Sequence, residues 1–188
     1  MPFARGLQLP ELPASRPLRY SSEAITLELV GAEARALGGA TGEAWGVLDV
    51  GRGRWPYRTQ RSCAGAAGRS SDGRVVSLQR GGKWTDGTGF TEKNTIVDGH
   101  LNELGEDLTW EYSWEEPMRP WRATAPGGAL HLTLRLCFDR HARTNTGALA
   151  TEVPQMFGAW AGSSRTDAGE VVTIEGLQGL AEESGSRW

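Results

Sequence analysis

The stretch Leu130-His131-Leu132-Thr133-Leu134-Arg135-Leu136-Cys137-Phe138 alternates apolar and polar residues over nine positions. Successive side chains of a β-strand point to opposite faces, so this period of two predicts one buried and one solvent-facing side. A strand with one solvent-exposed face is typical of antiparallel sheets. We therefore expect a half-buried antiparallel strand here, with Phe138 among the buried residues.

The same kind of pattern recurs along the chain. An Asp-Gly pair between apolar flanks predicts a β-hairpin over residues 95–104, because both positions of its turn tolerate positive φ. Aromatic residues alternate with polar ones in a further strand over 108–114. Other strands are expected at residues 23–30, 45–50, 74–79, 156–161 and 170–177, the last two joined by a turn at 167–169.

About eight short strands with turn signals and no long helical pattern favour an all-β protein. We expect an antiparallel lipocalin-like barrel or β-sandwich with little helix. The 26 glycines suit such a fold, because Gly serves tight turns. Prolines at positions 10, 13 and 17 predict an irregular N-terminal arm over residues 1–20, followed by a single β domain over 21–188.

Charge and cysteine usage narrow the class of partner. Twenty basic against 23 acidic residues give no strong field for nucleic acid or an anionic membrane surface, and no apolar run is long enough for a membrane span. Cys63 and Cys137 are the only cysteines, which favours free thiols and a cytoplasmic location.

The candidate site centres on the Gly-rich loop of residues 81–92. A phosphate-binding loop is disfavoured, since Lys83 is followed by Trp84 rather than by Ser or Thr entering a helix. Polar groups beside aromatic walls instead predict a ligand cavity, although for each Trp residue taken singly core packing is the better explanation. The predicted ligand-binding residues are Asp49, Arg52, Trp55, Tyr57, Arg58, Trp84, Trp110 and Trp121, and the candidate catalytic residues are Lys83, Asp86 and Glu92.

Three functions remain open at this point, beside the alternative of a structural fragment that binds no ligand. The first is binding of an apolar or amphipathic small molecule in a Trp-lined pocket. The second is a cofactor-free isomerase, hydratase or cyclase that uses carboxylate acid–base chemistry, and the third is a carbohydrate-binding module. No spacing of His or Cys indicates a metal, and no cofactor is expected. We interpret Glu182-Glu183 as a solvated pair.

Several segments carry a resemblance to a known family. They are residues 45–59, 81–89, 106–112 (Glu-Asp-Leu-Thr-Trp-Glu-Tyr), 118–121 (Met-Arg-Pro-Trp) and the tail with 155–158, Glu182-Glu183 and Arg187-Trp188. In order and spacing they resemble the bacterial family called domain of unknown function 2804. The resemblance implies an antiparallel β fold, loosely analogous to the lipocalin-like barrels of carotenoid hydratases and tocopherol cyclase.

The sequence also departs from that family pattern. Arg61-Ser62-Cys63 stands where the pattern has Trp-Asn-Trp, and Pro154 where it has His. If those positions serve a site, this chain has lost an activity or changed its ligand. Family members are expected to be longer at the N-terminus, so we also expect either a missing N-terminal portion or self-association into a homo-oligomer through exposed strand edges.

Overall fold

The computed structural model describes residues 7–8, 19–29, 42–52, 56–83 and 91–187, with side chains for Trp45 and from Pro56 onward. These residues form twelve strands and no helix, and every pairing between strands is antiparallel. The strands are β1 (Leu7–Gln8), β2 (Arg19–Leu29), β3 (Gly42–Arg52), β4 (Arg58–Arg69), β5 (Val75–Gly82), β6 (Asn94–Val97), β7 (His100–Glu103), β8 (Thr109–Glu111), β9 (Trp121–Thr124), β10 (Leu130–Asn145), β11 (Ala150–Arg165) and β12 (Val171–Arg187).

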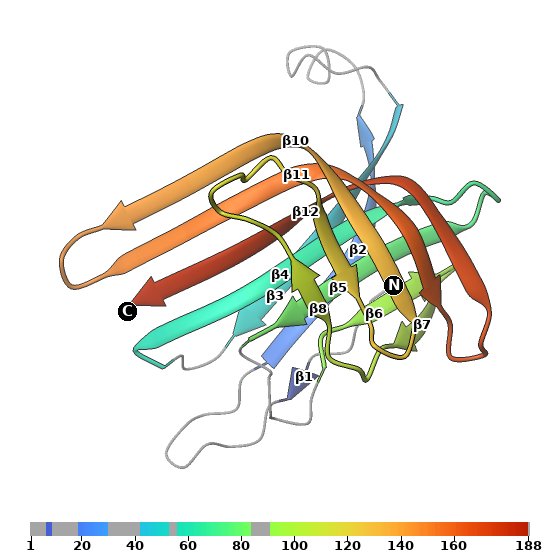
Figure 1. Ribbon diagram of the computed structural model, residues 1–188, viewed down its shortest axis with the longest axis horizontal. Helices are drawn as coiled ribbons and strands as arrows, with labels where there is room; N and C mark the ends of the chain where they lie inside the picture. Colours follow the sequence, from blue (N-terminus) through green and yellow to red (C-terminus); the bar gives the residue numbers. More distant parts are fainter. Residues whose placement is uncertain (1–6, 9–18, 30–41, 53–55, 84–90, 188) are drawn as a thin grey trace.

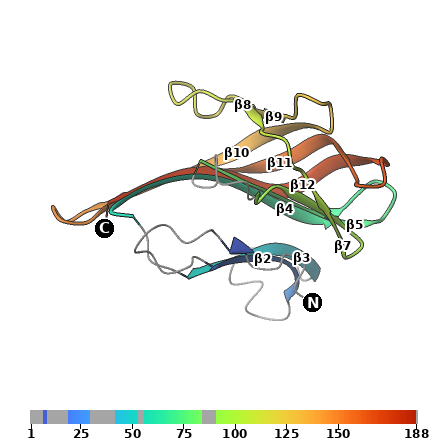
Figure 2. The same ribbon diagram turned by 90° about the horizontal axis from the view of Figure 1, so that it is seen from below.

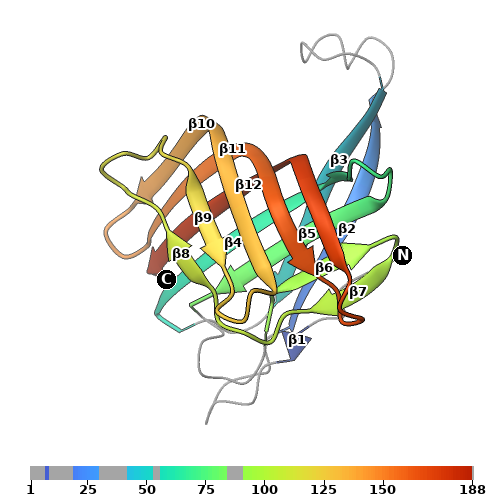
Figure 3. The ribbon, with the colours of Figure 1, turned by 45° about the vertical axis from the view of Figure 1, so that its right-hand side comes forward.

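Nine of these strands form one sheet in the order β7-β6-β5-β4-β12-β11-β10-β9-β8, and β1-β2-β3 form a second sheet (Figure 1). The large sheet curls into a half-barrel, with β6–β7 along one edge and β8–β9 along the other (Figure 3). The predicted all-β antiparallel fold is thereby confirmed. Figure 2 shows β2 and β3 on one side of the large sheet and β8 and β9 on the other.

A series of side-chain hydrogen bonds identifies the concave face. Thr95 Oγ1 on β6 lies 2.7 Å from Ser164 Oγ on β11, although three strands separate β6 from β11 in the sheet. The two side chains can meet only across the inside of the curl. Arg80 on β5 joins them by donating to Thr95 Oγ1 at 2.7 Å. This chain of hydrogen bonds therefore links one edge region of the half-barrel to its far wall.

The apolar core also lies on the concave face. Leu134 on β10 pairs with Trp160 on β11, which pairs with Leu177 on β12, so the three side chains share one face. The core is completed by residues from β4, β5, β6 and β9, and its largest fully buried members include Val76, Leu130, Leu132, Leu134, Met156, Trp160, Val172 and Ile174.

The alternation of apolar and polar residues predicted over 130–138 is confirmed over most of its length. Leu130, Leu132 and Leu134 are buried, and the polar residues between them are exposed or half-buried. The expectation for Phe138 is wrong, because its side chain is 56% exposed. A register shift between Leu136 and Phe138 interrupts the pairing with β11, and a β-bulge changes which face the following side chains occupy.

The Asp-Gly hairpin is confirmed as β6–β7. Asp98 and Gly99 have φ values of 47° and 84°, the positive pair that a two-residue type I′ turn requires. The predicted strand over 108–114 is shorter than expected, since β8 ends at Glu111. Trp110 and Tyr112 nevertheless pack against the core as the aromatic stripe predicts.

Strand β4 was not expected, because its sequence Arg-Thr-Gln-Arg-Ser-Cys-Ala-Gly-Ala-Ala-Gly-Arg lacks large apolar residues. Its small residues let neighbouring strands approach closely. A Cβ on Gly68 would lie 2.8 Å from Leu177 Cδ2, and one on Gly179 of β12 would lie 2.2 Å from the Gly65 carbonyl oxygen. This central strand is therefore specified by what packs against it.

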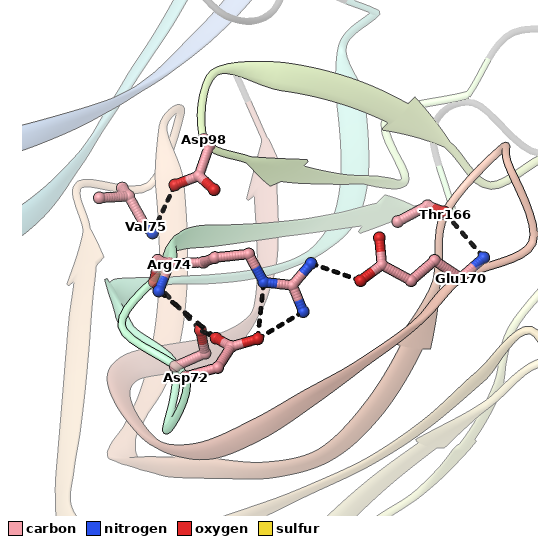
Figure 4. A network of polar contacts seen from close by, with 7 residues as sticks. Asp72, Arg74, Val75, Asp98, Thr166 and Glu170 are labelled. Atoms are coloured by element: carbon pink, nitrogen blue, oxygen red, sulfur yellow. Dashed lines mark hydrogen bonds and ion pairs between the residues drawn. The ribbon is translucent and has the colours of Figure 1, made fainter.

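A polar cluster fixes three turns at one end of the sheet (Figure 4). The Arg74 guanidinium donates to Asp72 at 2.7 Å and to Glu170 at 2.6 Å, which ties the β4–β5 turn to the β11–β12 turn. Asp98 of the β6–β7 turn accepts from the Val75 amide at 2.9 Å. The hydrogen bonds from Arg74 and Ser70 hold the pKa of Asp72 at about 2.

Strands β7 and β8 follow each other in sequence but lie at opposite edges of the large sheet. Residues 104–108, which we call the crossing segment, therefore pass from one edge to the other. The Leu104 amide donates to the Lys93 carbonyl oxygen at 2.8 Å, and Glu106 accepts from the Gly127 amide at 2.6 Å. These contacts hold the crossing segment to both edges of the half-barrel.

Candidate functional site

A hollow of about 430 Å³ opens on the concave face, beside the apolar core. Strands β4, β5 and β12 supply one wall, and the crossing segment and the residues around β8 and β9 supply the other. Its lining combines three aromatic side chains with both lysines of the chain and several carboxylates. The residues used below are Ser62, Lys83, Lys93, Asp107, Trp110, Tyr112, Trp121 and Glu183.

The aromatic wall is a packed group rather than a set of separate rings. Tyr112 stacks on Trp121 with ring centroids 4.3 Å apart and an interplanar angle of 18°. Trp114 meets both rings edge-on at 5.3 Å. Trp110 lies edge-to-face with the core residue Trp160 at 6.3 Å. Such contacts hold the rings in place, so the aromatic wall of the hollow is rigid.

Glu183 is the polar centre of the hollow. It forms an ion pair with Lys83 through Oε1, and its Oε2 accepts a hydrogen bond from the Tyr112 hydroxyl at 2.6 Å. Burial raises the pKa of Glu183, but the hydrogen bonds from Lys83 and Tyr112 outweigh it, so the net pKa lies below the ordinary value. Burial and the neighbouring carboxylate raise the pKa of Tyr112 to about 12. At neutral pH the pair is therefore an ionised carboxylate and a protonated phenol.

Lys93 carries the second positive charge of the hollow. Its side chain is only 10% exposed, whereas that of its partner Asp107 is 95% exposed. The two groups are 2.9 Å apart, and Asp107 belongs to the crossing segment. Sequence reasoning did not select Lys93, which directly precedes strand β6, whose four residues Asn-Thr-Ile-Val are all buried.

The interpretation of Glu182-Glu183 as a solvated pair is wrong. Consecutive side chains of β12 point to opposite faces of the strand, so the two carboxylates have different partners, although both residues line the hollow. Glu182 is 6% exposed, forms an ion pair with Arg61 at 3.1 Å and accepts from Gln155 at 2.6 Å. The expected strand ended at residue 177, ten residues before the observed one, which hid this alternation.

The hollow brings together three of the residues predicted for the site, Lys83, Trp110 and Trp121. Tyr57 is exposed, and Arg58 lines a separate open hollow with Arg143 and Arg187. Glu92 is buried, and its side chain occupies the space where a Cβ on Gly81 would lie. It is not among the described residues that line the first hollow. Trp55, Trp84 and Asp86 lie outside the described residues, as do the side chains of Asp49 and Arg52 on β3.

A second hollow of about 390 Å³ continues along the concave face and shares Glu183 with the first. His141 and Glu152 line it, with His141 Nε2 at 2.8 Å from Glu152 Oε1. Pro154 is the cross-strand partner of His141, and Ser62 is the cross-strand partner of Glu183. Both residues, at which we expected a departure from the family pattern, line the concave hollows.

Metal and membrane features are absent from the part of the chain that the structure describes. It contains no group of three His, Cys, Asp or Glu side chains arranged to hold a metal ion. It also contains no helix with the length and apolar character needed to cross a membrane. Cys63 and Cys137 are not joined in a disulfide.

Comparison with known proteins gives one match. Neither the curated proteins nor the solved structures contain a match to this chain. Residues 29–188 match the family described as domain of unknown function, DUF2804. The match covers all of the nine-stranded sheet and every described residue that lines the hollow. The chain therefore belongs to the DUF2804 family, in agreement with the resemblance seen in its sequence.

Proposed function

We propose that the concave hollow binds a small amphipathic molecule whose apolar part lies against the aromatic wall. The observation that carries this proposal is the convergence of Trp110, Tyr112 and Trp121 with Lys83 and Glu183 around about 430 Å³. Ligand sites are typically concave, of about 300–1,000 Å³, and mostly apolar, with a few oriented polar groups. The hollow has each of these properties.

The rigidity of the wall also supports binding. Tyr112 is held by its stack on Trp121 and by its hydrogen bond to Glu183, so little side-chain entropy would be lost when a ligand packs against it. The core proper is filled by Leu130, Leu134 and Ile174, which leaves the hollow as a separate space beside it.

The ionisation of the site favours binding over acid–base catalysis by the Tyr112–Glu183 pair. A general acid or base works best with a pKa near the operating pH. The pKa of Glu183 is lowered and that of Tyr112 is raised to about 12, so the two groups move away from neutrality in opposite directions. They suit the orientation of a ligand better than the transfer of its protons.

Titration of intrinsic Trp fluorescence with a panel of fatty acids, fatty alcohols, terpenoids and oligosaccharides tests the proposal. We expect saturable quenching or a spectral shift with amphipathic compounds, and its loss in Trp110→Leu. Trp45→Leu is the matched control, since Trp45 lies on β3 with Arg69 stacked at 5.5 Å, outside the hollow.

No response to any amphipathic compound at concentrations below micelle formation would refute the proposal. A response only to oligosaccharides would replace the ligand class with sugars, whose rings also stack on aromatic side chains. Equal loss in the Trp110 and Trp45 variants would place the signal outside the hollow.

A further inference from the structure

Lys93 occupies an unusual electrostatic position in the hollow. Its ammonium group is held at the wall with 10% of the side chain exposed. In the described part of the chain its Nζ has one hydrogen-bond partner, Asp107 Oδ1 at 2.9 Å. An ammonium group carries three N–H donors, so this contact uses one of them.

The pairing with Asp107 is weak for a charge this buried. Asp107 is 95% exposed, so water competes for its oxygens and screens the attraction. A buried ammonium needs a close acceptor because its desolvation is costly. The site therefore favours any further oxyanion that reaches Lys93 from inside the hollow.

The other charged groups of the hollow already have partners: Glu182 pairs with Arg61 and Gln155, and Lys83 pairs with Glu183. Both oxygens of Glu183 are engaged, one by Lys83 and one by the Tyr112 hydroxyl. The positive charge of Lys83 and the negative charge of Glu183 therefore neutralise each other. Of the two lysines in the hollow, Lys93 is therefore the one that a ligand can bind most readily, either beside Asp107 or in its place.

We propose that Lys93 binds the acidic head of the ligand, a carboxylate or phosphate monoester, while the apolar body lies along the Trp110–Tyr112–Trp121 wall. This inference rests on the proposed binding function and specifies the ligand as an anionic amphiphile. Asp107 is the exchangeable counter-ion of Lys93 in the ligand-free protein. Because Asp107 lies on the crossing segment, binding of the head group releases that side chain without breaking the backbone bond from Leu104 to Lys93.

The test compares probes that differ only in the head group. Dodecanoic acid, dodecyl phosphate and dodecanol are titrated into the full chain by calorimetry below their micelle concentrations. We expect at least one of the two anions to bind about tenfold or more tightly than the alcohol, the size expected for one hydrogen bond to a charged group.

The variants separate anchoring from folding. Lys93→Met should abolish the preference for the anion while leaving the affinity for dodecanol unchanged. Asp107→Asn should strengthen anion binding, because it removes the competing carboxylate. Lys93→Arg keeps the charge and should keep the preference, which provides a second reading if Lys93→Met does not fold. Arg122→Met is the matched control, since Arg122 is 60% exposed and pairs with Glu111 on the neighbouring edge strand.

Failure of this inference is distinguishable from failure of the proposed function. If the alcohol and both anions bind the natural chain equally, or if Lys93→Met weakens alcohol and anion binding alike, the hollow binds ligands but Lys93 does not anchor the head group. If none of the three probes binds although another amphipathic compound of the fluorescence panel does, the anchor is refuted and the binding function stands. If no compound of either set binds, both are refuted.

Discussion

Replacing the large residue Arg80 should change stability less than replacing the smaller residue Thr95, which accepts a hydrogen bond from it. We predict that Arg80→Met changes the free energy of unfolding by less than about 2 kcal/mol, whereas Thr95→Val lowers it by about 2–3 kcal/mol. The reason is that the first change removes a buried charge together with its hydrogen bonds. The second change leaves that charge in place with fewer partners.

The magnitudes follow from the surroundings of the guanidinium. Arg80 is 1% exposed, and burial lowers its pKa to about 9, so it remains charged at neutral pH. Its desolvation costs several kcal/mol. Hydrogen bonds to the Gln79 carbonyl at 2.7 Å, to the Asn94 carbonyl and to Thr95 Oγ1 at 2.7 Å return about 1.5–3 kcal/mol each. The two contributions nearly cancel, and Met refills most of the space.

Thr95→Val has no such compensation. It removes one acceptor from the buried guanidinium and also leaves the Ser164 hydroxyl without its partner at 2.7 Å. A buried polar group left without a partner costs about 1–3 kcal/mol. Most of that cost should disappear when Arg80 is already Met, because only the hydroxyl of Ser164 then remains unsatisfied.

Urea unfolding followed by Trp fluorescence at pH 7 provides the assay, applied to both single variants and to the double variant. The expected coupling energy is about 1–2 kcal/mol. A loss above about 4 kcal/mol for Arg80→Met together with no measurable loss for Thr95→Val would refute the reasoning, because it would show that the buried charge is strongly net stabilising.

Three further predictions concern the hollow and its supports. Tyr112→Phe should lower stability by about 1 kcal/mol at pH 7 through loss of the bond to Glu183. The pKa of Glu183 is lowered in the folded protein, so the stabilisation by its ionised form is present above the unfolded pKa and is lost as pH falls through the folded pKa. If the difference in denaturant midpoint between Tyr112→Phe and the natural chain were as large at pH 3 as at pH 7, this reasoning would be contradicted. Leu134→Ala should cost about 3–4 kcal/mol in urea unfolding, whereas the exposed control Leu149→Ala should change stability by less than about 0.5 kcal/mol; equal effects would mean that Leu134 is not a core residue. Gly158→Ala places a Cβ 2.1 Å from a backbone carbonyl of β10, so circular dichroism should show lost strand signal or a lower melting temperature, and an unchanged melting temperature would show that the two strands can separate.

Features carried by neighbouring residues could be predicted from the sequence. The alternation in residues 130–136 fixed the strand and its buried face, and the Asp98-Gly99 pair fixed a turn, because both depend on local backbone geometry. The predicted aromatic stripe also placed Trp110 and Tyr112 against the core. Lys83, Trp110 and Trp121 were selected for the site on residue type alone, and they line one hollow.

Features carried by pairing between distant segments could not be predicted. Strand β4 consists of small residues whose strand conformation depends on β12 and β5 beside it. The bulge after Leu136 exposes Phe138, and the long pairing of β11 with β12 extends the last strand to Arg187. The prediction of a solvated Glu182-Glu183 pair failed for that reason.

The sequence by itself determined that this chain is an antiparallel β protein of the DUF2804 family with aromatic and charged residues available for a site. Only the tertiary structure decided that β4 and β12 lie at the middle of the sheet and that the sheet curls. It also decided that Glu183, Tyr112 and Lys93 line one hollow inside the curl. The physical reason is that strand periodicity is written in adjacent residues, whereas strand order and curvature are set by hydrogen bonds and packing between residues far apart in the chain.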